Sequence, residues 1–415
     1  LLESLGDAGA YNRFAYAGFD PLFVITGKVG ELIVNGKSYQ TNDPFMELKP
    51  IAASNTSRDG FCGGLVGFVS YEATSLFEKA FQGRDCDDFP LFAFGFYTDG
   101  LKFDKRIRQV TYFHHGNSRL RELRSLLDRG GALSRFSYKK IDQRISQKEY
   151  QENLEKIQKH IRKGDIFQAV YSLKTRFQIK GDKRRLYAKL RITNPSPYMS
   201  YLKFEEKEII SASPELLINV KDKSIEHFGT LAGTIKRGKD EKEDHVLAKE
   251  LSSNEKEKAE HLMLVDLARN DLGKVCEFKS IRVGKLMAVK KLKFVMHLIT
   301  EIRGRLKIGE DVFSALAACF PAGTLTGAPK IEAMKIISDV ENEARGPYGG
   351  VIGYMSLNKS AMFSIAIRSI FINGEHGFTQ TGSGIVLDSS AEKEFEEILN
   401  KQKGMEEALR KAMQQ

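Results

Sequence analysis

The strand-like segments of this sequence follow one another through tight turns, and many neighbouring pairs have no helix between them. Segment 22–25 is followed by segment 30–34, which ends at an Asn-Gly dipeptide typical of hairpin turns. Segments 351–357 and 362–372 form a second pair of strands. Neighbouring strands of a parallel sheet need a long crossover, usually a helix. We therefore expect an α+β fold in which large antiparallel β-sheets pack as a sandwich with helices on the outside.

Four longer segments are predicted to be helices. Ser146 is a typical N-cap for one of them and Gly164 ends it, and the last of them begins with a capping box at Ser389 and Glu392. The four segments are 119–128, 146–163, 254–269 and 389–411.

The clearest break along the chain lies near residue 130. Gly130 and Gly131 end the helix 119–128, and the better patterned part of the sequence follows. We expect an N-terminal β-rich part over residues 1–135 and a catalytic part over residues 140–415.

Composition excludes several classes of protein. The 415 residues are 41% hydrophobic, which is enough for a packed core and too much for a disordered chain. No stretch approaches the roughly 18 to 20 uncharged apolar residues of a membrane helix. The four cysteines are scattered, which argues against a disulfide framework or a zinc site and indicates a reducing compartment. We therefore expect a cytoplasmic protein.

The net charge of +10 comes from 64 Lys and Arg against 54 Asp and Glu. Basic and acidic residues alternate along the chain, as in segment 239–258, and this pattern is typical of a solvated surface rather than of a nucleic-acid footprint. An anionic small molecule suits the basic excess equally well. We expect no nucleic-acid partner and no membrane.

Two predicted helices each carry a pair of glutamates three residues apart, Glu257 with Glu260 and Glu394 with Glu397. This spacing puts both carboxylates of a pair on one helical face, where they repel each other unless a cation neutralises them. Hard oxygen ligands of this kind suit Mg²⁺. A solvated face of Glu and Lys is the alternative interpretation.

An arginine in an apolar strand is a candidate anion clamp. Ser364, Ala366 and Arg368 point to one face of their strand, and the small neighbours leave space for a guanidinium to bind a carboxylate. An arginine on an exposed sheet face would show the same pattern. The Gly-rich turns 322–330 and 381–384 would let backbone amides approach an anion, although such turns are often structural.

Other catalytic arrangements are less well supported. No Ser-His-Asp or Cys-His arrangement can be argued from spacing, so no covalent nucleophile is indicated. His297 is polar within an apolar segment, and a hydrogen-bonded core histidine is the simplest interpretation. Segment 233–240 has P-loop spacing, but Asp240 stands where Ser or Thr would hold magnesium, so we expect no nucleotide site there.

Nine segments in a fixed order carry a resemblance to a known family. They are Leu1–Ser4, Gly63–Gly67, Gly164–Gln168, Asn194–Met199, Ser213–Glu215, Ala232–Thr234, Glu257–Asp271, Gly323–Lys330 and Gly382–Val386. Together they resemble the chorismate-utilising enzymes, and within them the anthranilate synthase component I family. The resemblance is dense from about residue 146 to residue 415 and thinner before it.

The resemblance implies that chorismate and ammonia are converted, with Mg²⁺, to anthranilate and pyruvate through 2-amino-2-deoxyisochorismate, in tryptophan biosynthesis. It implies that Glu260 and Glu397 hold the metal with Glu257 and Glu394 in support, and that the metal binds the ring carboxylate of chorismate. The implied substrate contacts are Tyr348, Arg368, Gly382, Ser383, Gly384, Gly233 and Thr234.

Four catalytic roles are implied in the same way. Glu215 would protonate the departing C4 hydroxyl, and His297 with Thr324 would assist the elimination of pyruvate. Gln168 lies where the water-using relatives carry a lysine that activates water, and a neutral amide suits amination by ammonia instead. Aminodeoxychorismate synthases commonly carry a lysine at the position of Ala232, so Ala232 disfavours aminodeoxychorismate synthase component I, which is the alternative.

The resemblance also implies partners and regulation. The chain shows no glutamine amidotransferase motif, so ammonia would come from a separate glutamine amidotransferase subunit, component II, in a heterotetramer of two large and two small subunits. Tryptophan would act as a feedback inhibitor. The residues implied to bind it are Glu3, Ser4, Pro195, Pro197, Tyr198 and Met199.

Overall fold

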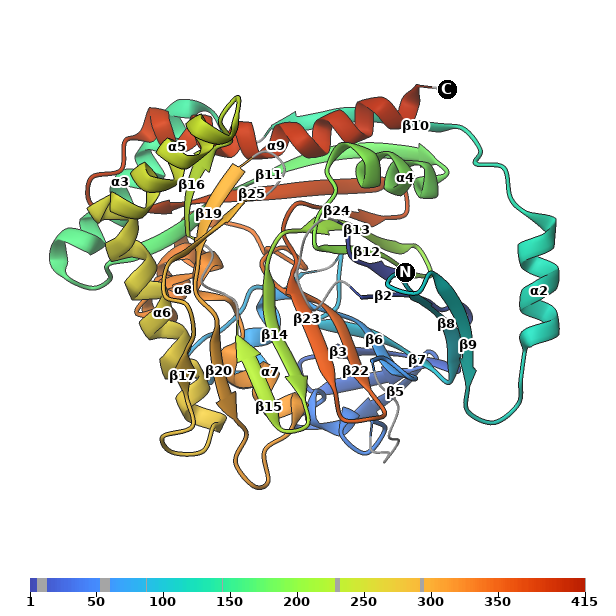
Figure 1. Ribbon diagram of the computed structural model, residues 1–415. Coiled ribbons are helices and arrows are strands. Elements are labelled where there is room, and N and C mark those ends of the chain that lie inside the picture. Colours follow the sequence, from blue (N-terminus) through green and yellow to red (C-terminus); the bar gives the residue numbers. More distant parts are fainter. Residues whose placement is uncertain are drawn as a thin grey trace.

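Two large antiparallel sheets form the centre of the structure, a computed structural model that describes residues 1–5, 13–52, 60–86, 88–143, 145–227, 232–291 and 295–414. Within these ranges each large sheet has eleven strands and a third sheet has three. In Figure 1 the first sheet runs from the top of the molecule down its right side to β8 and β9, and the second sheet lies below its upper part, with most helices on the outside. The predicted α+β architecture is confirmed.

The first large sheet joins N-terminal strands to strands of the later chain. Its strands are β1 Leu2–Glu3, β2 Phe14–Ala17, β8 Asp99–Asp104, β9 Gln109–His114, β10 Phe136–Gln143, β11 Gln168–Gly181, β12 Tyr198–Phe204, β13 Lys207–Ser213, β21 Gly327–Ala328, β24 Ser369–Asn373 and β25 His376–Ile385. Their order is β10-β11-β25-β24-β13-β12-β1-β2-β8-β9, and β21 pairs with β11.

The second large sheet is built in the same mixed way. Its strands are β3 Phe23–Lys28, β4 Glu31–Val34, β5 Lys37–Gln40, β6 Gly64–Val69, β7 Phe92–Tyr97, β14 Leu216–Lys221, β15 Ser224–His227, β17 Arg282–Val283, β20 Ile302–Arg305, β22 Val351–Ser356 and β23 Ala361–Ile365. Their order is β17-β20-β15-β14-β23-β22-β6-β7-β3-β4-β5. The predicted hairpin signal is confirmed, since Asn35 and Gly36 join β4 to β5 with φ of 47° and 80°.

The third sheet consists of β16 Ala232–Lys236, β18 Ala288–Lys291 and β19 Val295–Ile299. In both large sheets, strands from before residue 135 pair with strands from after residue 140, as β1 does with β12 and β6 with β22. The division of the chain into parts 1–135 and 140–415 stays a prediction.

The helices lie mostly on the outer faces of the sheets (Figure 1). They are α1 Thr74–Phe77, α2 Leu120–Arg129, α3 Gln147–Lys163, α4 Lys183–Thr193, α5 Glu241–Ser253, α6 Glu255–Val275, α7 Val312–Cys319, α8 Lys330–Glu341 and α9 Ala391–Met413, with short 3₁₀ turns at η2 Met46–Leu48, η3 Tyr71–Ala73 and η4 Gly323–Leu325. Ser146 caps α3 as predicted, and Gly164 ends it with φ of 82°. Helix α9 begins one residue later than its predicted capping box, because Ser390 is the N-cap.

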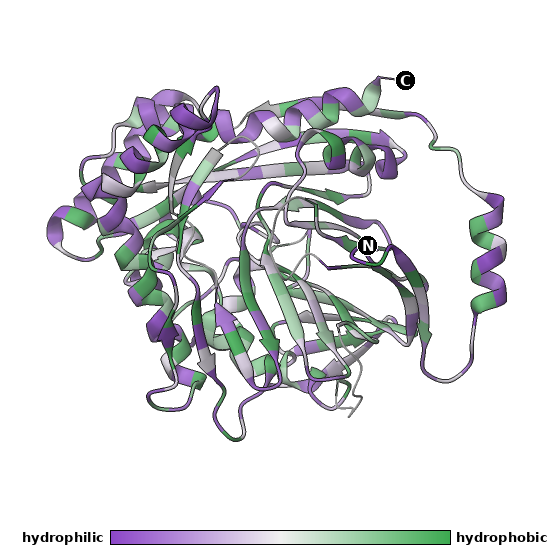
Figure 2. Ribbon diagram, viewed as in Figure 1, coloured by the Kyte–Doolittle hydropathy of each residue, from purple (hydrophilic) through white to green (hydrophobic). Residues whose placement is uncertain are grey.

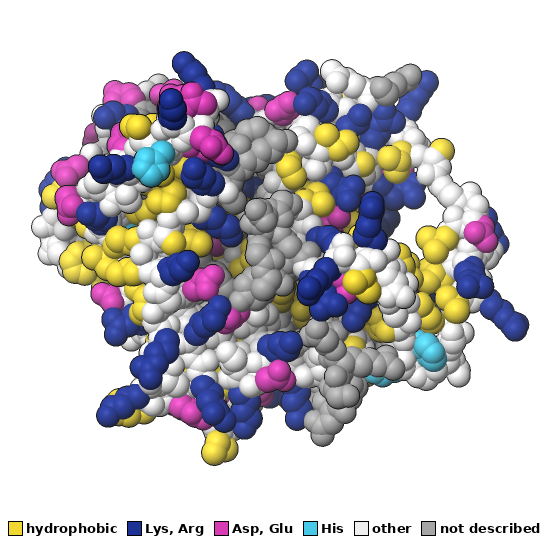
Figure 3. All heavy atoms as spheres, in the orientation of Figure 1, with side chains coloured by type: hydrophobic (Ala, Val, Ile, Leu, Met, Phe, Trp, Pro, Cys, Tyr) yellow, Lys and Arg dark blue, Asp and Glu magenta, His cyan; other side chains and the backbone are white. Residues whose placement is uncertain are grey.

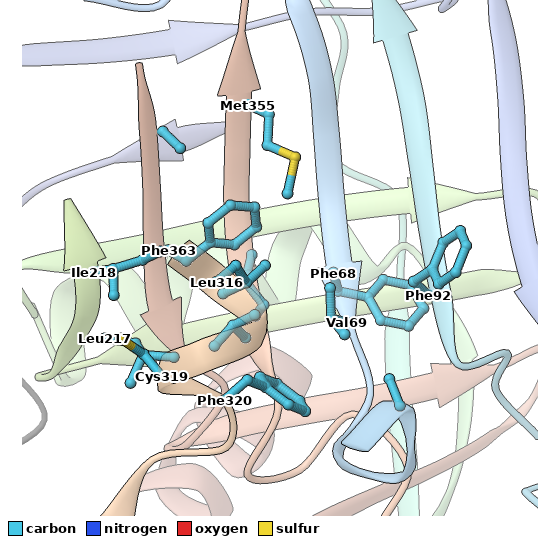
Figure 4. Packing of buried hydrophobic residues seen from close by; sticks show 14 of the residues in the cluster. Phe68, Val69, Phe92, Leu217, Ile218, Leu316, Cys319, Phe320, Met355 and Phe363 are labelled. Atoms are coloured by element: carbon cyan, nitrogen blue, oxygen red, sulfur yellow. The ribbon is translucent and has the colours of Figure 1, made fainter. Parts of the chain in front are cut away.

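The main core packs the second sheet against α6, α7 and strands of the first sheet. Figure 4 shows Phe363 beside Leu316 of α7, Phe320 just after the end of that helix, and Phe68 and Phe92 on the neighbouring strands β6 and β7. A second core lies between the first sheet and the helices α4 and α9. Figure 2 shows that the outer helices carry both apolar and polar residues. Within the described ranges no helix is long and apolar enough to span a bilayer. Basic and acidic side chains are interspersed on the face shown in Figure 3.

The strand predicted over residues 362–372 is wrong in its middle. The chain leaves the second sheet after Ile365 and enters the first sheet at Ser369. Arg368 lies in the intervening bend with φ of 52°, a left-handed conformation that strand periodicity does not predict. Arg368 is therefore at the crossing between the two sheets and not on a sheet face.

Candidate active site

Helices α6 and α9 bring the four predicted metal ligands near one another. Glu257 and Glu260 lie in the first two turns of α6, where the Asn254 side chain accepts a hydrogen bond from the Glu257 amide at 3.3 Å. Glu394 and Glu397 lie in the first two turns of α9. The first three of these glutamates are half-buried, whereas Glu397 is exposed.

The four carboxylates interact electrostatically. Burial raises the pKa of Glu257, Glu260 and Glu394, and the negative charge of Glu397 raises each of them further. Oxygen donors that repel one another in this way fit Mg²⁺ by chemistry and by charge. Among the described residues, no group of three acidic, His or Cys side chains is close enough together to hold an ion.

Lys401 places a positive charge among these carboxylates, and the sequence analysis missed it. Its Nζ lies 2.5 Å from Glu397 Oε1 and donates to the Gly382 carbonyl at 3.0 Å. The backbone carbonyl of Lys401 accepts a hydrogen bond from Arg368 Nη1 at 2.8 Å. The i,i+4 spacing from Glu397 on a predicted helix was the signal that could have identified it. A cation of the protein thus stands beside a predicted metal ligand.

Arg368, Tyr348 and His297 lie next to this cluster. Burial lowers the pKa of Arg368, and the negative charge of Glu397 opposes that shift. Tyr348 is buried and its phenol interacts with the Gly382 backbone. Burial, together with the positive charge of Arg368, lowers the pKa of His297 to about 4. The imidazole is therefore neutral near pH 7, and the group combines a half-buried cation, a buried phenol and a neutral histidine.

Gly233 connects His297 to the carboxylates. His297 Nδ1 lies 2.9 Å from the Gly233 carbonyl oxygen. Gly233 has φ of 67°, and a Cβ at this position would lie 2.9 Å from Glu257 Oε2. Only glycine fits this conformation and this close approach. The side chains of Ala232 and Thr234 lie outside the described part of the structure, although the backbone of both residues belongs to β16.

Glu215 is buried and is paired with the half-buried Thr324. Thr324 Oγ1 donates to Glu215 Oε1 at 3.1 Å, and Glu215 is 4% exposed. Glu215 follows β13, where its amide donates to Ser213 Oγ at 3.3 Å. A buried carboxyl group held by a hydroxyl is suited to proton transfer.

Gln168 begins β11 and lies against the paired strand β25. A Cβ on Gly384 would collide with Gln168 Nε2, so the amide packs directly on the glycine backbone. Gln168 Oε1 is buried and has no hydrogen-bond partner among the described residues. On the same strand as Gly384, Ser383 Oγ lies 3.0 Å from Tyr150 Oη and also interacts with Glu394. Strand β25 thus links the amide of Gln168 to the carboxylates.

A separate cavity of about 580 Å³ gathers most of the residues predicted to bind an inhibitor. Strand β1 pairs with β12, with Glu3 opposite Met199. Glu3, Ser4, Pro197, Tyr198 and Met199 line the cavity, and Pro195 is not among its lining residues. Within the described structure Ser4 Oγ and Ser200 Oγ are buried without a hydrogen-bond partner, and Ser200 also lines the cavity.

Comparisons with known proteins agree with this geometry. A family model described as chorismate binding enzyme matches residues 6–407. Anthranilate synthase component 1 of Methanothermobacter marburgensis is 40% identical over 100% of this chain and 90% of its own. The crystal structure of anthranilate synthase component I from Streptococcus pneumoniae TIGR4 matches with a TM-score of 0.86 and 34% identity, over 96% of this chain and 94% of that one. Aminodeoxychorismate synthase component 1 of Bacillus subtilis is 35% identical over 96% of this chain and 89% of its own.

Proposed function

This chain belongs to the chorismate-binding enzyme family, in its anthranilate synthase component I branch, and from that premise we propose that it combines chorismate with ammonia to give anthranilate and pyruvate. The observation that carries the proposal is the amide of Gln168, whose buried Oε1 has no hydrogen-bond partner among the described residues. An amide oxygen can accept a hydrogen bond from ammonia but cannot deprotonate water. Ammonia is already a nucleophile and needs no base at this position.

Substrate binding would use both charged groups of the site. A magnesium ion held by Glu260 and Glu397, with Glu257 and Glu394 in support, would neutralise and orient the ring carboxylate of chorismate. The half-buried guanidinium of Arg368 and the phenol of Tyr348 would donate hydrogen bonds to the enolpyruvyl carboxylate. The backbone at 382–384 borders both positions and would limit how the ring can lie.

In the first step, ammonia would attack C2 of the ring while the hydroxyl group leaves from C4. Hydroxide is a poor leaving group, so Glu215 would donate the proton that lets it leave as water. The Thr324 hydroxyl would orient the carboxyl group through its hydrogen bond to Oε1. Loss of a proton from the new ammonium group then gives 2-amino-2-deoxyisochorismate.

In the second step, the neutral His297 would act as the base. Because a carbonyl oxygen can only accept, the contact with the Gly233 carbonyl places the proton on Nδ1 and the lone pair on Nε2. Nε2 would remove the proton from C2 as the enolpyruvyl group departs, and protonation of that group gives pyruvate. The ring becomes aromatic, which drives the elimination.

The ammonia would come from a glutamine amidotransferase subunit, and the designation of the relatives as component 1 supports such a partner. We infer that the two subunits assemble as a heterotetramer and act in the cytoplasm, with two large and two small subunits in each complex.

The cavity beside β1 would bind tryptophan as a feedback inhibitor. Its volume of about 580 Å³ suits an amino acid with a large aromatic side chain, and the buried hydroxyls of Ser4 and Ser200 offer hydrogen bonds to its polar atoms. The variant Ser200→Phe should fill the cavity and abolish inhibition by tryptophan while leaving the ammonia-dependent rate intact. Inhibition that persists unchanged in this variant would place the tryptophan site elsewhere.

The decisive experiment is to incubate the chain with chorismate, MgCl₂ and an ammonium salt and to follow anthranilate by its fluorescence. The alternative, aminodeoxychorismate synthase component I, is disfavoured because Ala232 has no amine with which to attack the ring. Formation of 4-amino-4-deoxychorismate without anthranilate would establish that alternative and overturn the proposal.

A further inference from the structure

Arg345 is buried where three segments meet, and these segments carry Gln168, Thr324 and Tyr348. Its side chain is 1% exposed, and it lies between the end of α8 and Tyr348. Its guanidinium binds Glu341 in a bidentate manner, with Nε donating to Oε2 at 2.7 Å and Nη2 donating to Oε1 at 2.6 Å. Glu341 is buried as well, so the two charges neutralise each other within the core.

The remaining donors of Arg345 reach backbone carbonyls next to two proposed catalytic residues. Nη1 donates to the Leu325 carbonyl at 2.6 Å, one residue after Thr324. Nη2 donates to the Val170 carbonyl at 2.7 Å, two residues after Gln168. One rigid planar group therefore fixes the distance between η4 and the start of β11.

The same side chain contacts the segment that carries Tyr348. The guanidinium carbon lies 4.5 Å from the ring centre of Tyr71 and 5.6 Å from that of Tyr348. The carboxylate of Glu72 accepts hydrogen bonds from the amides of Arg345 and Gly346, at 2.7 Å and 2.9 Å. These contacts hold the turn between α8 and Tyr348 in one conformation.

We propose that Arg345 is a positioning residue for the reaction, holding Gln168, Thr324 and Tyr348 in the relative positions that the chemistry needs. This inference rests on the proposed function. The two hydrogen bonds from Arg345 to Glu341 are enough to neutralise the Glu341 charge. The additional bonds to Leu325 and Val170 connect separate segments on either side of the guanidinium, and displacement of catalytic groups by about 1 Å can cost on the order of a hundredfold in rate.

Two variants separate positioning from stability. Arg345→Lys keeps a positive charge near Glu341, but a single ammonium group cannot span Glu341 and both carbonyls. The double variant Arg345→Met with Glu341→Gln removes both charges, so neither is left buried without a partner. We expect both variants to fold and kcat/KM for chorismate to fall on the order of a hundredfold, mostly through kcat.

Arg119 provides a control whose hydrogen-bond and ring partners include none of the proposed site residues. It binds Asp99 in a bidentate manner, donates to the Phe19 carbonyl and stacks on the Phe19 ring at 4.7 Å. Arg119→Lys loses the same kinds of contact away from the proposed site. We expect it to lower the melting temperature and to leave kcat within about twofold of the unchanged protein.

Initial rates should be measured both as chorismate consumption and as anthranilate fluorescence, well below the melting temperature of each variant. A double variant that folds with kcat within about twofold of the unchanged protein would show that Arg345 only stabilises the core. The same result for Arg345→Lys would overturn the inference if the double variant does not fold. Chorismate consumption without anthranilate would overturn the proposed function instead, and the comparison among variants would still test the role of Arg345.

Discussion

The ammonium group of Lys401 lies 2.5 Å from Glu397 Oε1, one turn apart on α9, and it also donates to the Gly382 carbonyl. The protein therefore places its own cation on a carboxylate that is proposed to bind magnesium. Binding of the metal to Glu397 must compete with this ion pair.

The variant Lys401→Met should therefore bind Mg²⁺ more tightly. Both partners are partly exposed, with side-chain exposures of 31% and 50%, so the pair is worth at most about 1 kcal/mol. Removal of the competing charge should lower the Kd for Mg²⁺ by up to about fivefold, as measured by isothermal titration calorimetry without substrate. Lys411→Met is the matched control, because Lys411 makes an i,i+4 pair with Glu407 on the same helix. Equal affinities in both variants would show that Lys401 does not compete with the metal.

Replacement of Glu260 by Gln should have opposite effects with and without metal. Burial, together with the negative charge of Glu257, raises the pKa of Glu260 above its unfolded value. Ionisation of this group therefore lowers stability progressively as the pH rises from the unfolded pKa through the folded pKa. In metal-free buffer at neutral pH, E260Q should melt at or above the temperature of the unchanged protein. The rise in melting temperature on addition of MgCl₂ should be largely lost, and kcat/KM should fall by roughly a hundredfold or more.

Glu407→Gln is a matched control for that experiment, since Glu407 lies on α9 beside Lys411 and away from the carboxylate cluster. It should leave the MgCl₂-dependent rise unchanged. A full rise in E260Q would exclude Glu260 as a ligand.

The variant His297→Met should accumulate the amino intermediate. In the unchanged protein the imidazole of His297 is neutral near pH 7, because burial lowers its pKa to about 4. Only the elimination of pyruvate is proposed to use this imidazole. Amination should continue, so 2-amino-2-deoxyisochorismate should appear on chromatography while the anthranilate rate falls by about a hundredfold or more. An unchanged anthranilate rate would remove His297 from the mechanism.

Buried His227 should make the protein less stable as the pH falls from about 7 to 5. Burial lowers its folded pKa to about 4, whereas the unfolded value is about 6.5. Between these values the unfolded chain binds a proton that the folded chain does not, so the free energy of unfolding should fall by about 1 to 2 kcal/mol over this window.

Urea unfolding at several pH values would test this prediction. His227→Gln should show a smaller loss of unfolding free energy between pH 7 and pH 5 than the unchanged protein. His245→Gln, which replaces an exposed histidine, serves as the control. Identical losses in all three proteins would contradict the expected role of His227.

The antiparallel architecture could be predicted because its signals are local. Asn35 and Gly36 adopt the positive φ angles of a hairpin turn, and the caps of α3 lie at Ser146 and Gly164 as its pattern indicates. Such features depend on a few neighbouring residues and therefore appear in the sequence.

The site was predicted less completely because its geometry depends on the crossing between sheets. The bend at Arg368 breaks a continuous apolar pattern, and nothing in the spacing of that pattern marks the change of sheet. Arg345 was missed for a related reason, since a buried arginine is recognised by its partners on distant segments and not by its neighbours in sequence. The roles assigned to the glutamates remain predictions that the experiments above test.

The bend at Arg368 also has a mechanical consequence. The cavity beside β1 is lined by Met199 from the first sheet and by Ser364 from β23 of the second, and the chain runs from Ser364 directly to Arg368. An amino acid bound in this cavity would contact both sheets at once, and the shortest covalent route from Ser364 leads to Arg368, the proposed ligand of the enolpyruvyl carboxylate. If tryptophan binds there as proposed, feedback control would need no relay through distant helices, because only the short segment after β23 separates Ser364 at the cavity from Arg368.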